Sequence, residues 1–156
     1  MNETLVSEER VSDELFHSYF SPFTPHTITI DGVVYPTVEH AYHAMRYRDE
    51  KLKDEIRRVV SPEEAWEISQ RYKDMQETDF PAKKRAIMKS LCKAKLMQHQ
   101  DVLDALLATG DLKIVKHITS GPKADGYWDD GTQGDGQNVT GQIWMELRAE
   151  LKQNTK

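Results

Sequence analysis

The sequence has little cysteine, no long apolar run and no excess of basic residues. Its single cysteine, Cys92, excludes an internal disulfide framework and favours a reducing compartment. No apolar stretch approaches the roughly 20 residues that a membrane-spanning helix needs, and the acidic first residues lack the apolar segment of a secretory signal. The net charge of −5 argues against a chain that coats nucleic acids or membranes electrostatically. We therefore expect a soluble cytoplasmic protein that does not bind membranes.

Glycine is also scarce, except near the end of the chain. Six of the eight glycines fall between Gly121 and Gly141, just before a final helical pattern. The 156 residues are enough for one domain with a substantial core. The polar, charged residues 1–14 predict a flexible N-terminal segment, and residues 15–153 predict a single compact domain.

Local signals predict a mainly α fold with a small β element, an α+β class. Thr27–Ile30 alternate polar and apolar residues, Asp31-Gly32 is a two-residue turn signal, and Val33–Tyr35 return as the second strand. Thr37 is a candidate N-cap for a helix that opens at Val38. Capping residues, prolines and a terminal glycine predict further helices at 62–72, 82–99, 100–110 and 142–151. A short apolar segment at 112–119 predicts a strand.

The helix that follows Pro81 carries a lysine on its apolar face. At about 100° per residue, Lys84 shares one face with Ile87, Met88, Leu91 and Lys95. Burial disfavours the ammonium form of a lysine and makes its neutral amine accessible, and such an amine can form a Schiff base with a sugar aldehyde. The alternative is a lysine whose stem covers the core while its head reaches solvent.

The stretch "YPTVEHAYHAM" places Glu39 and two histidines in the first turns of a helix. Glu39 lies beside the apolar stripe, on a flank with His43 and Arg46. It is either a helix-start glutamate favoured by the dipole, or a carboxylate that stabilises positive charge at the rim of a pocket. The order Glu-His-x-x-His is not the zinc motif H-E-x-x-H, and the sequence has no second cluster of His or Cys at ligand spacing, so no metal is expected for His40 and His43.

The segment "YWDDGTQGDGQN" combines glycines with three aspartates. Glycines let a backbone approach a ligand closely. Asp129, Asp130 and Asp135 would repel a phosphate unless they turn outward or bind ribose hydroxyls, and the spacing does not fit an EF-hand. Ribose recognition, acid–base chemistry by one aspartate and a purely structural turn all remain open. Trp128 is the aromatic residue most suited to stack on a ligand.

Four ordered motifs resemble the NADAR, or YbiA-like, family, and the resemblance runs from about Phe20 to Leu151. The motifs are "FSPF", "IDGVVYPTVEHAYHA", "KKRAIMKSLCKAKLMQHQDVLDALLATG" and "YWDDGTQGDGQNVTGQIWMELR". The resemblance implies N-glycosidase activity on a bond between ribose C1 and nitrogen, without a cofactor. It further implies a catalytic Glu39, Lys84 and Asp130, with Lys84 capturing C1 as a Schiff base, in a cleft walled by the Lys84 helix and closed by the glycine-rich loop. The implied substrate-binding residues are Phe23, His40, Phe80, Trp128, Gly131, Gly134, Gly136 and Asn138.

The chain departs from the family pattern at six positions: Pro22, His43, Phe80, Asp129, Asp135 and Gln137. Asp135 and Gln137 stand where the family commonly has lysines, so phosphate-binding charge is missing from the loop. An anionic substrate must therefore be held elsewhere, with Lys123 and Arg46 as candidates.

The family implies two substrate classes. We expect removal of ADP-ribose from guanine bases of DNA or RNA slightly ahead of cleavage of phosphorylated pyrimidine intermediates of riboflavin biosynthesis. A rival of another class is a module that binds ADP-ribose or a nucleotide without turning it over. Such a module would not need both Glu39 and Lys84. The sequence does not determine the oligomeric state.

Overall fold

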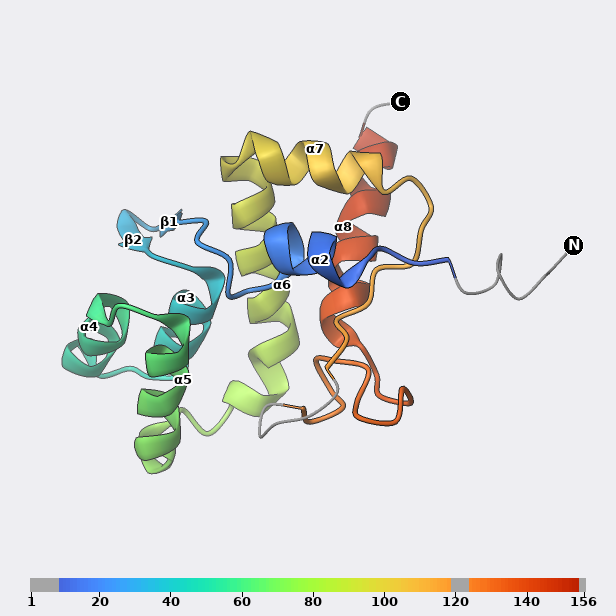
Figure 1. Ribbon diagram of the computed structural model, residues 1–156. Coiled ribbons are helices and arrows are strands. Elements are labelled where there is room, and N and C mark those ends of the chain that lie inside the picture. Colours follow the sequence, from blue (N-terminus) through green and yellow to red (C-terminus); the bar gives the residue numbers. More distant parts are fainter. Residues whose placement is uncertain (1–8, 119–123, 155–156) are drawn as a thin grey trace, which may run out of the picture. The chain divides into compact units, whose positions relative to one another are not determined.

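The computed structural model describes residues 9–118 and 124–154, and it divides the chain into two compact units. The central unit is Pro22–Gln100. The terminal unit combines Met1–Ser21 with Asp101–Lys156. Both units are mainly helical, and one antiparallel pair of strands lies in the central unit (Figure 1). The predicted α+β class is confirmed.

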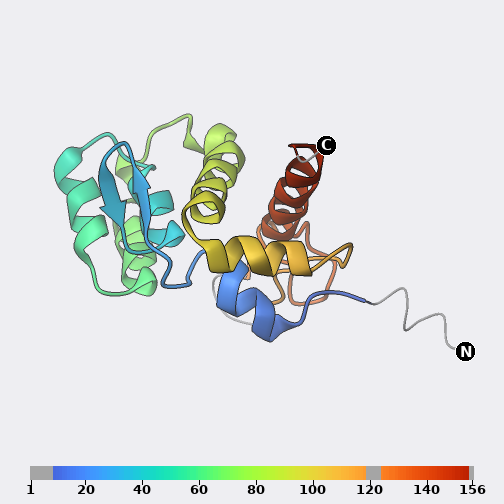
Figure 2. The ribbon, with the colours of Figure 1, turned by 90° about the horizontal axis from the view of Figure 1, so that it is seen from above.

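The hairpin of the central unit forms where the alternating pattern predicts it. Strand β1 (Ile28–Ile30) pairs with β2 (Val33–Tyr35), and Ile28 faces Tyr35 across the ladder. Asp31 and Gly32 have φ values of 51° and 82°, the left-handed conformation that a two-residue type I′ turn requires. Ile28 and Tyr35 are buried, β1 packs against the long helix α6, and β2 packs against α3. Figure 2 shows the hairpin beside the helices of this unit.

Helix α3 (Val38–Ala44) is the buried centre of this unit. All seven of its residues are buried, and it packs against α4 (Glu50–Arg58), α5 (Pro62–Arg71) and α6 (Phe80–Gln98). A short 3₁₀ helix, η2 (Lys73–Met75), lies between α5 and α6. A helix surrounded on several sides has no solvent face, so its polar residues must find partners inside the protein.

The predicted helix starts are confirmed at α3 and α5. Thr37 caps α3, because its Oγ1 accepts a hydrogen bond from the His40 N–H at 3.1 Å. Ser61 and Glu64 form a complete capping box at α5, with Pro62 in the first turn. Such caps satisfy backbone N–H groups that have no partner within the helix.

The terminal unit has a core of aromatic and aliphatic side chains. It contains α2 (Asp13–Leu15), the π-helix η1 (Phe16–Phe20), α7 (Gln100–Ala108), which starts at the unit boundary, and α8 (Val139–Asn154). Trp144 is fully buried against Phe20, with ring centroids 5.2 Å apart, and its indole N–H donates to the Phe20 carbonyl at 2.8 Å. Indole rings need such an acceptor when they are buried.

The strand predicted at 112–119 is wrong for the described residues 112–118. Only Lys113 forms an isolated bridge, to Arg10, and the Val11 N–H donates to the Lys113 carbonyl at 2.8 Å. Ile114 and Val115 are both buried, so the apolar run reflects an extended core segment with a single pairing step. None of the described helices is both long and apolar enough to cross a membrane.

Candidate active site

Glu39 is a buried carboxylate with a short hydrogen bond to His43. Only 8% of the residue is exposed, and its backbone N–H donates to the Pro22 carbonyl. One turn along α3, His43 Nε2 lies 2.6 Å from Glu39 Oε2. The spacing of four residues places both side chains on one face of the helix. Glu39 is therefore held inside the unit and is not a solvated helix-start residue.

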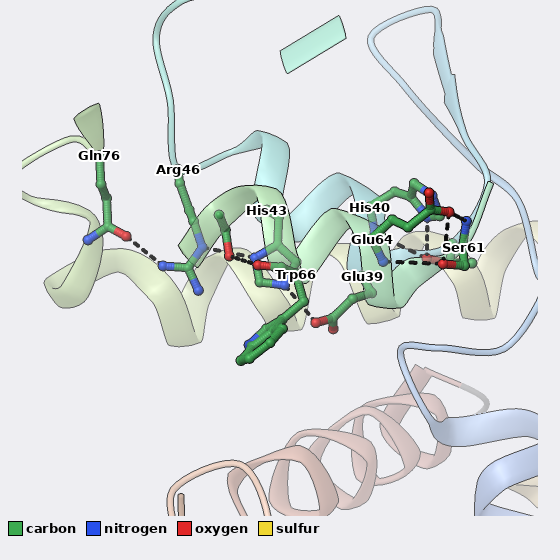
Figure 3. A network of polar contacts seen from close by, with 10 residues as sticks. Glu39, His40, His43, Arg46, Ser61, Glu64, Trp66 and Gln76 are labelled. Atoms are coloured by element: carbon green, nitrogen blue, oxygen red, sulfur yellow. Dashed lines mark hydrogen bonds and ion pairs between the residues drawn. The ribbon is translucent and has the colours of Figure 1, made fainter. Parts of the chain in front are cut away.

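The other ring nitrogen of His43 is bound to Arg46 (Figure 3). Arg46 Nε donates to His43 Nδ1 at 3.0 Å, and Arg46 Nη1 donates to Gln76 Oε1 at 2.5 Å. The guanidinium carbon also lies 4.8 Å from the Phe80 ring centroid and 5.1 Å from that of Tyr42. Arg46, a candidate for holding an anionic substrate, is thus engaged within the protein.

His40 lies in the core and ties α3 to the end of α4. It is fully buried, its Nδ1 lies 2.8 Å from Thr37 Oγ1, and its Nε2 lies 3.0 Å from the Val59 carbonyl. Burial lowers the pKa of the His40 imidazole, and the Val59 carbonyl acts in the opposite direction. Both ring nitrogens of His40 and of His43 are thus engaged with protein partners.

Lys84 begins the second turn of α6 and is half-buried. The apolar stripe predicted for this helix is present, since Met88 and Leu91 are buried. The fully buried lysine of the stripe is Lys95, whose Nζ donates to Thr24 Oγ1 at 2.6 Å. Lys84 therefore lies at the half-buried end of the apolar stripe, whereas Lys95 lies at its fully buried end. Of the two aromatic residues predicted for this unit, Phe80 is buried and Phe23 is half-buried.

Asp129 and Asp130 have different roles in the glycine-rich loop of the terminal unit. Asp129 is fully buried, and its Oδ1 accepts from the N–H groups of Gly126 at 3.1 Å and Gly131 at 2.8 Å. Asp130 Oδ2 lies 2.7 Å from His117 Nδ1. Asp129 thus folds the loop, whereas Asp130 forms a histidine–carboxylate pair. Sequence reasoning missed His117 because its partner lies 13 residues away in an irregular segment.

A pocket of about 370 Å³ gathers four of the predicted residues of this unit. Asp130, Gly134, Gly136 and Asn138 line it. They are joined by Glu9, Arg10, Lys113 and Val115. Sequence reasoning missed the two cations, Arg10 and Lys113, which the bridge between their backbones brings together across a hundred residues. Lys123 lies outside the described residues.

The predicted glycines of the loop form hydrogen bonds within the loop, whereas Asn138 connects the loop to the segment at 114–116. The N–H of Gly131 donates to Asp129, that of Gly134 to the Gly131 carbonyl, and that of Gly136 to the Asp130 carbonyl. The Asn138 amide donates to the Ile114 carbonyl at 3.0 Å and accepts from the Lys116 N–H at 2.8 Å. Trp128 is half-buried, with Tyr127 edge-on at 4.8 Å. In the structure these glycines and Asn138 shape the loop.

Comparison with known proteins identifies the family. Residues 8–152 match the NADAR domain. The chain is 35% identical over 151 residues to "N-glycosidase YbiA" of Escherichia coli (strain K12), covering 97% of this chain and 91% of that protein. It is 30% identical over 138 residues to "Riboflavin biosynthesis protein VVA0006" of Vibrio vulnificus (strain YJ016), covering 88% of this chain and 36% of that protein. The NMR structure of the E. coli protein YbiA matches with 36% identity and a TM-score of 0.78, over 87% of this chain and 79% of that one. The chain belongs to the NADAR family.

Proposed function

We propose that this protein is an N-glycosidase that hydrolyses the C1–N bond of a phosphorylated ribosyl pyrimidine of riboflavin biosynthesis. The activity is supported by membership of the NADAR family and by 35% identity, over almost the whole chain, to a protein named N-glycosidase YbiA. The substrate class is supported by the relative named as a riboflavin biosynthesis protein. The name of this relative supports the pyrimidine over ADP-ribosylated guanine, and we therefore reverse the order expected from sequence.

The observation that carries the proposal is the buried Glu39 carboxylate at the start of α3, held by His43 at 2.6 Å. Cleavage of a ribosyl C1–N bond develops positive charge at the sugar. A carboxylate held in a water-poor site stabilises such charge more strongly than one in bulk solvent. Removing a charged side chain from water is costly, so a buried carboxylate at the family's motif position is better explained by chemistry than by stability alone.

Lys84 supplies the nucleophile in this proposal. After the ribose ring opens, the neutral Lys84 amine adds to C1, and the base leaves with the electrons of the C1–N bond and one proton. The resulting imine between C1 and Lys84 Nζ is hydrolysed by water, which releases the sugar aldehyde and regenerates the amine. The half-buried position of Lys84 on the α6 stripe is compatible with access to a substrate.

Asp130 would bind a ribose hydroxyl or assist proton transfer. The His117 ring nitrogen beside it gives this carboxylate a partner that can exchange a proton. Arg10 and Lys113, in the same pocket as Asp130, could attract an anionic group and thereby replace the loop lysines that this chain lacks.

A second candidate substrate is ADP-ribose attached to guanine in nucleic acid, which the family resemblance supports. It needs the same C1–N cleavage and the same three residues. The net charge of −5 predicts weak non-specific affinity for nucleic acid, so recognition would rest on the ADP-ribosyl group itself.

The test is parallel incubation with the ribosylated pyrimidine phosphate and with an ADP-ribosylated guanine oligonucleotide, with borohydride added to trap an imine. We expect turnover of the pyrimidine and a trapped adduct on Lys84 that is lost in Lys84→Ala. Lys83→Ala is the matched control, because Lys83 is an exposed neighbour paired with Asp79. Turnover of the oligonucleotide alone would move the substrate to ADP-ribosylated guanine. Tight binding of ADP-ribose without turnover of either compound would leave a binding module.

A further inference from the structure

We propose that Arg46, His43 and Glu39 form a hydrogen-bonded relay in which His43 is a positioning residue for the Glu39 carboxylate. The inference deepens the proposed function and rests on it, because it assigns to Glu39 the contact with the reacting sugar. The three side chains come from α3 and the residues directly after it, and they form a continuous chain of contacts (Figure 3).

The partners of His43 fix where its proton lies. Arg46 Nε carries a hydrogen and can only donate, so His43 Nδ1 must accept and carries no proton. Glu39 is a carboxylate acceptor, so His43 Nε2 must carry the proton that it donates over 2.6 Å. The geometry therefore selects one neutral tautomer of His43. A protonated ring would direct an N–H at the Arg46 N–H, and the link to Arg46 would be lost.

The outer end of the relay is fixed by packing. The Arg46 guanidinium lies against the Phe80 and Tyr42 rings, and Gln76 accepts a hydrogen bond from its Nη1. These contacts hold a side chain that is otherwise rich in rotamers. The His43 side chain is itself only 2% exposed, so water does not compete for its ring nitrogens. The fixed Arg46 thus holds the His43 ring in one orientation, and the ring in turn orients the Glu39 carboxylate.

The relay fixes the orientation of the Glu39 carboxylate, which packing alone does not do. At metal sites, groups that orient a ligand through its hydrogen bonds contribute about 10- to 100-fold to affinity or activity, and we expect an effect of the same order here. Here the relay holds Glu39 in one orientation and directs a hydrogen-bond donor at its carboxylate before any substrate binds. A purely structural His43 would stabilise α3 but would not influence turnover once the protein is folded.

A glutamine can replace the relay chemistry, whereas a leucine cannot. The Gln amide carries an acceptor and a donor, and these can take the parts of Nδ1 and Nε2–H. His43→Gln therefore keeps both links. His43→Leu keeps apolar bulk, removes both links, and leaves Glu39 and Arg46 without this partner. Arg46→Met removes the outer link, together with the Arg46 contacts to Gln76, Phe80 and Tyr42, and leaves the contact between His43 and Glu39 in place. Arg46 is half-buried, a position that tolerates substitution better.

The first experiment reads the His43 tautomer by ¹⁵N NMR of imidazole-labelled protein at neutral pH, without substrate. We expect the Nε2–H tautomer in the wild type and a mixture of tautomers in Arg46→Met. A protonated Nδ1 in the wild type would overturn the proposal. This measurement does not depend on any enzymatic activity, so its result stands even where the proposed function fails.

The second experiment measures kcat and KM on the substrate that the wild type turns over, for variants whose folding is checked by thermal unfolding. We expect His43→Leu to lower kcat about 10- to 100-fold with little change in KM. We expect His43→Gln to keep kcat close to that of the wild type. If His43→Leu does not fold, Arg46→Met takes its place, with a smaller fall in kcat. Wild-type kcat in the variant that breaks the relay, or equal impairment in His43→Gln, would refute the relay. Wild-type kcat in Glu39→Gln would instead refute the role proposed for Glu39.

Discussion

At the scale of single residues, the start of α8 shows how closely backbone and side chains are packed beside the glycine-rich loop. Asn138 has a positive φ of 55°, and its amide links the Ile114 carbonyl to the Lys116 N–H. Gly141 lies directly against the Asn138 amide and the Ile114 carbonyl. A Cβ on Gly141 would overlap the Ile114 carbonyl oxygen and the Asn138 amide. The glycine is therefore required by close approach, although it lies inside a helix.

We predict that Gly141→Ala destabilises the protein, against the helix propensity of the two residues. Propensity alone favours alanine in a helix interior by about 1 kcal/mol. Here the added methyl must displace a backbone carbonyl, and such overpacking costs about 1–3 kcal/mol. Equilibrium urea unfolding measures the difference in the free energy of unfolding.

The reverse exchange on the exposed face of the same helix is the control. Ala149→Gly should lose about 1 kcal/mol, as propensity predicts, because Ala149 is exposed. A Gly141→Ala variant more stable than the wild type would show that the approach to Ile114 is looser than the structure indicates.

At the scale of elements, local chemistry was sufficient to predict most helices and the hairpin. Asp31-Gly32 fixed the turn, Thr37 the start of α3, and Ser61 with Pro62 the start of α5, because each acts on its immediate neighbours. The segment 112–118 was mispredicted as a strand because a strand needs a partner, and that partner is a single residue far away, Arg10. Pairing over long separations leaves no local signal.

The same distinction applies to the candidate site. Glu39 and His43 are four residues apart on one helix, so the sequence could place them on one flank. The His117–Asp130 contact and the pocket that joins Lys113 to Arg10 depend on irregular backbone, which no periodicity describes. The burial of Lys95 at the end of the stripe and the half-burial of Lys84 likewise depend on neighbouring elements, such as the Thr24 segment.

The capping box of α5 gives a prediction for one element. Ser61→Ala removes the Oγ that accepts from the Glu64 N–H at 3.2 Å. We expect a loss of about 1 kcal/mol in the free energy of unfolding. Ser90→Ala is the control, since this exposed hydroxyl donates to the Ile87 carbonyl within a helix and should contribute little. Equal losses for the two variants in urea unfolding would contradict a special role for the cap.

At the scale of the whole molecule, the residues assigned to chemistry are divided between the two units. Glu39 and Lys84 belong to the central unit, and Asp130 belongs to the terminal unit. Residues that the family motifs mark for one reaction therefore depend on the folding of both units. Global stability, and with it the pH range over which the protein stays folded, would therefore bear directly on the proposed activity.

His40 makes that stability depend on pH in a defined window. Burial lowers its pKa in the folded protein below the ordinary value of 6.5. The unfolded chain then binds the proton more readily, so the free energy of unfolding is highest above pH 6.5 and falls as the pH drops below it. The slope from one such histidine is at most about 1.4 kcal/mol per pH unit. We expect His40→Gln, which retains a donor and an acceptor, to flatten this slope in urea unfolding measured at several pH values.

The pH range in which His40 lowers the free energy of unfolding differs from that of the surface carboxylates. Hydrogen bonds from Arg57, Lys83 and Lys152 lower the pKa values of Asp54, Asp79 and Asp111 below their ordinary value of 3.8. The stability that these carboxylates contribute is present above pH 3.8 and is lost only at more acidic pH. We attribute to His40 a decline in the free energy of unfolding between about pH 6.5 and pH 4 that disappears in His40→Gln. His17→Gln is the control, because His17 is exposed and its replacement should leave the decline in place. An unchanged decline in His40→Gln would show that other groups take up the protons, and the imidazole between Thr37 and Val59 would then not limit the stability of the fold in acid.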